Sequence, residues 1–211
     1  HGGGQVRIGL VAAAYGTNGI PVPASAPYEI NLIDVPRMVA DAAAARRAGA
    51  DIVIVAVHAG TEYDQSPNDQ QRTVAQALLA SPDVDLVYMH HAHVVLPFER
   101  IGAKWVAYGL GNTLAKTAIE SNTVTAEQVM ARFTFARGAD GRYAVSRAAY
   151  VPALMPFTQP YRWVDLAAAL ADPSMPAALR QRYQQAADHI RQVVGSRGAF
   201  AAGLSVAGAT G

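Results

Sequence analysis

Two uninterrupted runs of apolar, largely β-branched residues place the strongest limit on how this chain can fold. Residues 52–57 read Ile-Val-Ile-Val-Ala-Val, and residues 84–89 carry Val, Leu, Val, Tyr and Met around a single Asp. Such runs are typical of strands that are buried on both faces, as in a parallel sheet covered by helices. A further apolar strand is expected over residues 5–15, and helical patterns separate the three strands. The order strand, helix, strand, helix, strand predicts an α/β domain.

Helix signals locate the two connecting segments. Residues 31–48 and 68–79 carry the helical patterns, with Asp34 as a capping residue and Pro36 near the first helical turn. Gly49 is a natural helix stop. The first helix is therefore expected to end just before the strand at residues 52–57.

The second half of the chain has the pattern of consecutive strands, in place of alternating strands and helices. Short strands are expected at residues 94–101 and 104–108, and residues 128–137 and 143–151 alternate around a glycine turn and predict a hairpin. Helical patterns follow, and the Gly/Ala-rich tail from Gly195 is expected to be loose. The expected helices cover 164–170 and 177–194. We expect one layered domain with a mixed sheet over residues 1–165 and a helical tail, residues 166–211, packed on it.

Composition excludes several classes of function. Cysteine is absent, which excludes disulfides, thiolate metal sites and cysteine nucleophiles. Seventeen basic and sixteen acidic residues give a net charge of +1 without a basic cluster, so no nucleic-acid partner is expected. No apolar run reaches the length of a membrane span.

Histidines follow two of the predicted buried strands. His58 comes directly after residues 52–57, and His90, His91 and His93 come directly after residues 84–89. Ligands bind at the carboxyl ends of strands in α/β sheets, and parallel neighbours would bring these loops together. In an extended segment the rings of His91 and His93 would lie on one side, able to chelate one cation or hold two adjacent ones. The alternative is that these are surface histidines without a ligand.

Polar residues in neighbouring loops are candidates for the same site. Glu62 could act as an acid or base, orient a ligand histidine or be solvated, and Tyr63 could contact a substrate. The loops holding Thr17, Asn18 and Asn112 could line a pocket, or they could be ordinary turns. A two-metal hydrolase site also needs carboxylates, including one that bridges the ions. The sequence has no Asp-x-His motif to supply them.

Three stretches resemble one protein family. Asp-Ile-Val-Ile-Val-Ala-Val-His-Ala-Gly-Thr-Glu-Tyr at 51–63, Asp-Leu-Val-Tyr-Met-His-His-Ala-His-Val at 85–94 and Val-Ala-Tyr-Gly-Leu-Gly-Asn at 106–112 are similar to the poly-γ-glutamate capsule-synthesis CapA family. That family belongs to the calcineurin-like metallophosphoesterase superfamily. The resemblance implies an α-β-β-α sandwich with mixed sheets, here the carboxy-terminal portion, incomplete at the amino terminus. It places His58, His91 and His93 as metal ligands, while His90 stands where the family has a small residue.

The resemblance also implies a function. A full-length protein would bind two divalent ions (Mn, Zn or Fe) and activate water against a phosphoester or polymer bond, with His90 or Glu62 assisting proton transfer. Thr17, Asn18, Tyr63 and Asn112 would contact the substrate, and a capsule-synthesis complex at the cell envelope or outside the cell would be the setting. The alternative is a non-catalytic envelope protein that binds or guides an anionic polymer during synthesis and export.

Overall fold

The computed structural model describes residues 5–115, 123–157 and 159–208 and contains two β-sheets. The first sheet has the order β1-β2-β3-β5-β4. Strands β1, β2, β3 and β5 run parallel, and β4 pairs antiparallel with β5. The first three strands end side by side, because Ala14, His58 and His90 are in register. The strands are β1 (Ile8–Ala14), β2 (Ile52–His58), β3 (Leu86–His90), β4 (Phe98–Ile101) and β5 (Lys104–Ala107).

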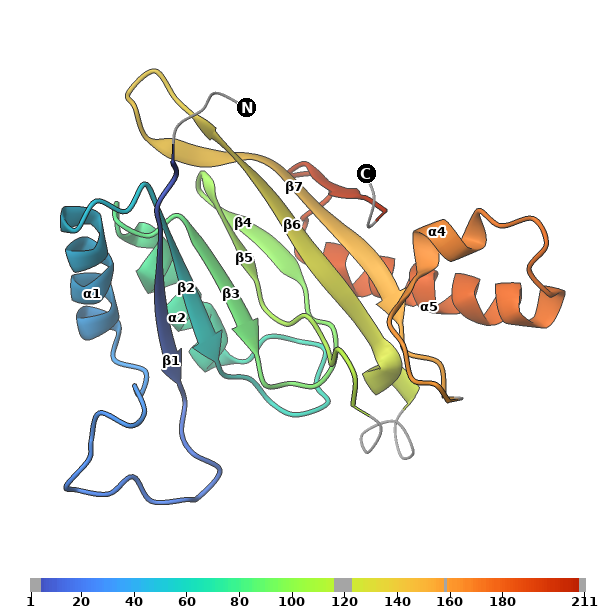
Figure 1. The fold of residues 1–211 in the computed structure, drawn as a ribbon, viewed down its shortest axis with the longest axis horizontal. Coiled ribbons are helices and arrows are strands. Elements are labelled where there is room, and N and C mark those ends of the chain that lie inside the picture. The colour runs from blue at the N-terminus through green and yellow to red at the C-terminus, as the bar shows by residue number, and fades with distance from the viewer. Residues whose placement is uncertain (1–4, 116–122, 158, 209–211) are drawn as a thin grey trace.

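Helices α1 (Val35–Arg47) and α2 (Asp69–Ala80) cover one face of this sheet, as Figure 1 shows. The Asp34 side chain accepts a hydrogen bond from the Arg37 N–H at 3.1 Å, which confirms the predicted cap. Asn68 and Gln71 form a reciprocal capping box at the start of α2. Alternate strand residues such as Val55 and Met89 pack against these helices in one hydrophobic core. The runs at residues 52–57 and 84–89 are therefore buried as strands, as predicted.

The second sheet is built on the predicted hairpin. Strand β6 (Glu127–Arg137) follows the short helix η1 (Thr123–Ala126) and pairs antiparallel with β7 (Tyr143–Leu154). Strand β8 (Val164–Asp165) pairs with β7 where the sequence predicted the start of a helix. Strand β9 (Leu204–Val206) pairs parallel with β7. The expectation of a loose tail is wrong, because β9 completes its backbone hydrogen bonds on a strand formed more than fifty residues earlier.

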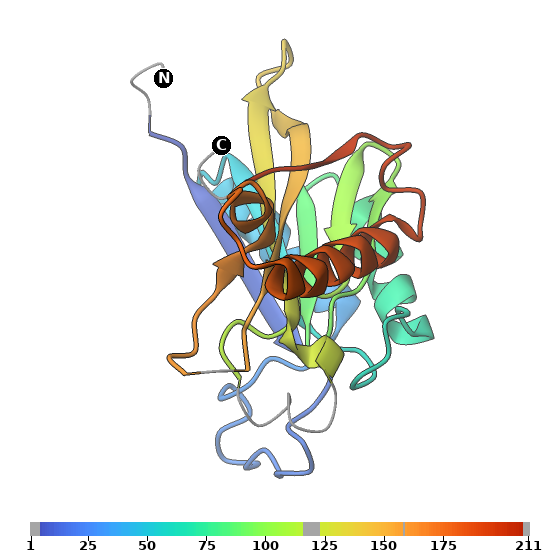
Figure 2. The same cartoon turned by 90° about the vertical axis from the view of Figure 1, so that its right-hand side faces the viewer.

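Helices α4 (Leu166–Leu170) and α5 (Ala177–Gly195) cover the far face of the second sheet, which Figure 2 shows with α5 in front. A second core joins α5, the second sheet and the inner face of the first sheet. The layers therefore run helix, sheet, sheet, helix, as expected for a calcineurin-like metallophosphoesterase. No helix within the described residues is both long enough and apolar enough to span a bilayer.

Candidate metal centre

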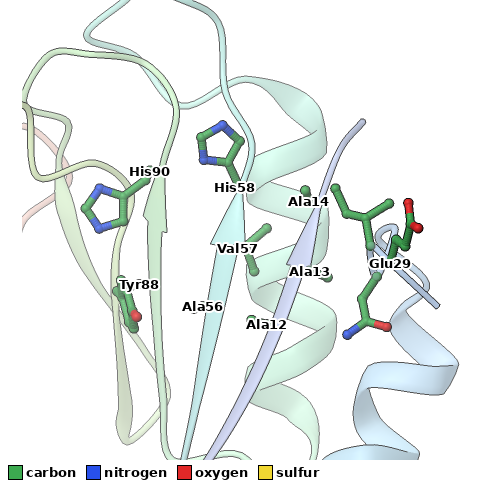
Figure 3. Close-up of a pocket in the computed structure, with 11 residues that line it drawn as sticks. Ala12, Ala13, Ala14, Glu29, Ala56, Val57, His58, Tyr88 and His90 are labelled. Carbon is green, nitrogen blue, oxygen red and sulfur yellow. The ribbon is translucent and has the colours of Figure 1, made fainter. Parts of the chain in front are cut away.

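Three strand ends form the floor of the candidate site. Side chains alternate along each strand, so His58 and His90 share the face of Ala56 and Tyr88, which looks toward the second sheet. Figure 3 shows the two imidazoles on the neighbouring strands β2 and β3. They line a pocket of about 400 Å³, whose other wall includes Glu29 from the loop after β1. The parallel register thus brings His58 and His90 to one edge, as predicted.

The rings of His58, His91 and His93 come together above this floor. Nε2 of His58 lies 3.2 Å from Nδ1 of His91, and the His91 and His93 ring centroids are 6.3 Å apart. Tetrahedral zinc with Zn–N bonds of about 2.0–2.1 Å would place two ligand nitrogens about 3.3 Å apart. The observed separation therefore suits two ligands of one cation. It also suits a hydrogen bond between two neutral imidazoles.

Asn112 orients the third imidazole. Its Oδ1 lies 2.8 Å from Nδ1 of His93, and its Nδ2 donates to the carbonyls of His93 and Thr125 at 3.1 and 3.3 Å. If His93 Nδ1–H donates to this amide, Nε2 keeps its lone pair for a ligand. The substrate contact predicted for Asn112 stays a prediction, and the structure adds that this side chain hydrogen-bonds to His93.

The backbone at the His-x-His segment is not extended. His91 has φ 119° and His93 has φ 61°, a region that residues with a Cβ rarely occupy. The expected alternation of an extended segment is therefore wrong, and a left-handed turn brings the two rings together instead. Strained non-glycine residues concentrate at functional sites because the surrounding structure holds them in place.

The surroundings of the strand-end histidines His58 and His90 disfavour the charged imidazolium form. Burial lowers the pKa of His58, and the neighbouring His91 and His93 lower it further. Burial also lowers the pKa of His90, with a smaller effect from His58. Since only the neutral imidazole can bind a metal, the electrostatics favour the ligand form.

Tyr15 is a member of the cluster that the sequence analysis missed. Its ring centroid is 4.6 Å from that of His91, and its hydroxyl donates to Oδ1 of Asn18 at 2.6 Å. Its N–H donates to the His58 carbonyl at 2.8 Å, so β1 and β2 remain joined past their last paired residues. The available signal was its position directly after a predicted strand, where the other site residues also lie.

The other predicted residues lie at different distances from the cluster. Tyr63 stacks near His93 at a centroid distance of 6.0 Å and donates its N–H to the Ala92 carbonyl at 2.8 Å. Glu62 is exposed in the same loop. Thr17 donates its hydroxyl to the Ile20 carbonyl and thereby folds its own loop. The roles predicted for these residues and for His90 stay predictions.

The histidines do not form a complete metal site by themselves in the described part of the chain. Within residues 5–115, 123–157 and 159–208, no group of three or more His, Asp or Glu side chains has the geometry of a metal site. Only the 3.2 Å spacing of His58 and His91 thus fits two imidazole ligands of one cation, and a two-cation site would need further ligands, carboxylates included.

A family model described as "Bacterial capsule synthesis protein PGA_cap" matches residues 3–117. The PGA biosynthesis protein CapA of Bacillus subtilis (strain 168) is 34% identical over 97 residues, which are 46% of this chain and 24% of that protein. The capsule biosynthesis protein CapA of Bacillus anthracis is 34% identical over 67 residues, 32% of this chain and 16% of that protein. The matches thus span a quarter or less of these relatives.

Among solved structures, the chain is similar to sulfate thiohydrolase SoxB of Thermus thermophilus in complex with glycerol. The TM-score is 0.44 at 14% identity, over 90% of this chain and 27% of that one.

Proposed function

Because the chain belongs to the bacterial capsule synthesis protein family PGA_cap, we propose that its histidine cluster is the imidazole part of a divalent-cation site for hydrolysis. The family matches residues 3–117, which include every histidine of the cluster and Asn112. The expected resemblance to CapA proteins is thereby confirmed.

One observation carries this proposal: Nε2 of His58 and Nδ1 of His91 are separated by 3.2 Å, the spacing of two ligands on one cation. The His93 ring centroid lies 6.3 Å from that of His91, and its Nδ1 is 2.8 Å from Oδ1 of Asn112. The backbone at His91 and His93 has positive φ, which is strained for residues with a Cβ. The surrounding structure must hold this conformation in place, as is common at functional sites.

Each residue of the cluster has a role in the proposal. His58, His91 and His93 hold divalent cations (Mn, Zn or Fe), Tyr15 packs against His91, and His90 lies beside His58 where it can accept or donate a proton. Bound divalent cations would lower the pKa of a water and polarise the bond under attack. Glu62 is the second candidate for proton transfer, and Thr17, Asn18 and Tyr63 are candidates for substrate contact. The residues of this cluster do not include the carboxylates that a two-cation site would need.

The substrate and setting are part of the proposal. The relatives are described as capsule and PGA biosynthesis proteins, which supports a phosphoester or a bond of an anionic capsule polymer as the target. The same descriptions support a place at the cell envelope or outside the cell, within a capsule-synthesis complex.

Metal titration tests the cation site. Isothermal titration of the protein with Zn²⁺ or Mn²⁺ is expected to show binding that the double variant His58→Ala/His91→Ala weakens at least tenfold, because two ligands are lost. His189→Gln is the matched control, since His189 lies on α5 and bonds to Glu127 instead. Unchanged binding in the double variant would refute the cation site.

A second candidate function is a non-catalytic protein that binds or guides capsule polymer. Among the described residues no group of three or more His, Asp or Glu side chains has the geometry of a metal site, and this favours the second function. The two functions separate in one assay: Mn²⁺- or Zn²⁺-loaded protein hydrolyses bis(p-nitrophenyl) phosphate in the first case. Metal binding without hydrolysis of this diester or of polymer would support the second.

A further inference from the structure

A pocket of about 180 Å³ has walls from both sheets and lies away from the histidine cluster. Its lining residues come from β4 and β5 of the first sheet, from β7 of the second sheet and from the turn before β9. Trp105 in this wall is in register with Leu86, the first residue of β3, whereas His90 is the last residue of that strand. None of the functions proposed above uses this pocket.

Two arginines in the wall carry a charge that no carboxylate balances. Arg100 lies on β4 and Arg147 on β7, and both residues are exposed to solvent. Among the described residues, neither has a hydrogen-bond or ion-pair partner. By contrast, Arg46 and Arg197 each pair with a carboxylate. Since the lining residues include no Asp or Glu, the pocket brings together two positive charges without a counter-charge.

The pairing of β4 with β5 places Arg100 on the face that borders this pocket. Arg100 is opposite Trp105 in the antiparallel ladder, and side chains that are paired in this way lie on the same face of a sheet. Trp105 packs in the second core and is only 4% exposed, so this face looks toward the second sheet.

A β-bulge in the second sheet exposes Arg147 at the same pocket. Thr134 of β6 is opposite Arg147, and the next residue of β6 is opposite Val145. Ser146 is therefore an extra residue on β7, and its hydroxyl donates to the Thr134 carbonyl at 3.1 Å. Val145 and Ala148 pack in the second core, whereas the two residues between them are exposed. The bulge thus interrupts the alternation of the strand, which is a common way to re-aim a side chain.

The charge and the size of the pocket select one kind of ligand group. The guanidinium group presents several N–H donors in a planar fork that matches the oxygens of a carboxylate or a phosphate. A cation would be repelled by both arginines, and an uncharged group would leave their charges unbalanced. The volume is below the range of about 300–1,000 Å³ that is usual for whole small-molecule ligands. It therefore suits a single charged group of a larger ligand.

We propose that this pocket is a subsite for one oxyanion group, phosphoryl or carboxylate, held between the guanidinium groups of Arg100 and Arg147. Such a subsite would give an anionic polymer a contact away from the histidine cluster under either function proposed above. The proposal does not rest on the cation site, because none of its residues belongs to that cluster.

Anion titration of metal-depleted protein, dialysed free of chelator, tests the subsite. The protein has two tryptophans, so ¹H–¹⁵N spectra contain two indole signals: Trp105 reports on this pocket, and Trp163, which lines a different one, is the internal control. Inorganic phosphate and acetate are expected to shift the Trp105 signal, whereas uncharged acetamide is expected to leave it in place. Raising the salt from about 0.05 M to about 0.5 M is expected to weaken phosphate binding at least fivefold. Tighter binding of phosphate identifies a phosphoryl ligand, and tighter binding of acetate identifies a carboxylate.

Variants identify the two arginines. Arg100→Gln and Arg147→Gln are each expected to weaken phosphate binding about tenfold, the effect of one charge-assisted hydrogen bond. Arg162→Gln is the matched control, because it removes the same charge from an exposed arginine outside the pocket and is expected to leave the affinity unchanged.

Three results would overturn the subsite. The first is a Trp105 signal that neither anion shifts, and the second is an acetamide shift as large as the acetate shift. The third is a double variant Arg100→Gln/Arg147→Gln that binds phosphate no more weakly than the Arg162→Gln control.

Discussion

His91 is the residue at which sequence and structure differ most informatively. The sequence was enough to predict that His91 follows a buried strand. It was also enough to predict that His91 lies close to His58, because parallel strands end at one edge of the sheet. Its φ of 119° was not readable, because nothing in His-His-Ala-His marks a left-handed turn. Tyr15 was missed for a related reason: its role depends on the side chains that face it, which strand alternation alone does not reveal.

Two substitutions at His91 separate backbone strain from ligand loss. Both His91→Gly and His91→Ala remove the imidazole, but only glycine accepts φ 119° freely. We expect His91→Gly to be more stable than His91→Ala by about 1 kcal/mol, measured as the free energy of unfolding in urea with a chelator present. An alanine variant as stable as the glycine variant would show that the turn stores no strain.

At the scale of elements, local sequence patterns were enough to predict most of the helices and strands. They were not enough to predict strand pairing between residues that are distant in the sequence. The runs of β2 and β3, the Asp34 cap and the hairpin of β6 and β7 were all predicted from neighbouring residues. Strand β9 was missed because its partner β7 lies far away in sequence and its three residues carry little pattern. The short β8 was absorbed into the expected helix because its two residues carry too little pattern to mark a strand.

Strand β1 is an element with an open side. It has β2 on one edge, and among the described residues its other edge carries only the bridge from Ala14 to Leu32. Ile8 and Leu10 are each 62% exposed. An apolar edge strand is a template for pairing with another chain. We expect the protein to associate at high concentration and Leu10→Lys to reduce this association, measured by sedimentation velocity.

The control for this change is Leu179→Lys, which replaces a leucine of α5 that is also exposed, at 41%. If both variants reduce association equally, general surface polarity rather than the strand edge is responsible.

At the scale of the whole molecule, the strand-end histidines couple the site to stability. Burial lowers the pKa of His58 and of His90 below the ordinary 6.5, so the unfolded chain binds protons first as pH falls. The stabilisation is complete above about pH 6.5 and is lost as the pH falls through the folded pKa values. Burial raises the pKa of Glu127, which acts in the opposite direction nearer to pH 4.5.

We therefore expect the metal-free protein to lose stability between about pH 7 and about pH 5.5, measured as the urea midpoint. The double variant His58→Gln/His90→Gln is expected to flatten this dependence, because glutamine does not titrate. If the urea midpoint of the double variant still falls with pH as in the unaltered protein, groups other than His58 and His90 cause the dependence.

Strand β9 has a consequence for the helices that precede it. The polypeptide leaves β7 at Leu154, forms α4 and α5, and returns to lie along β7 again through Leu204. Arg197, just past α5, adds a second fastening by gripping both carboxylate oxygens of Glu99 in β4, at 2.6 and 3.0 Å. The segment that contains α4 and α5 is therefore attached to the sheets on both sides of these helices. We expect a protease cut between α4 and α5 to leave two fragments that remain associated.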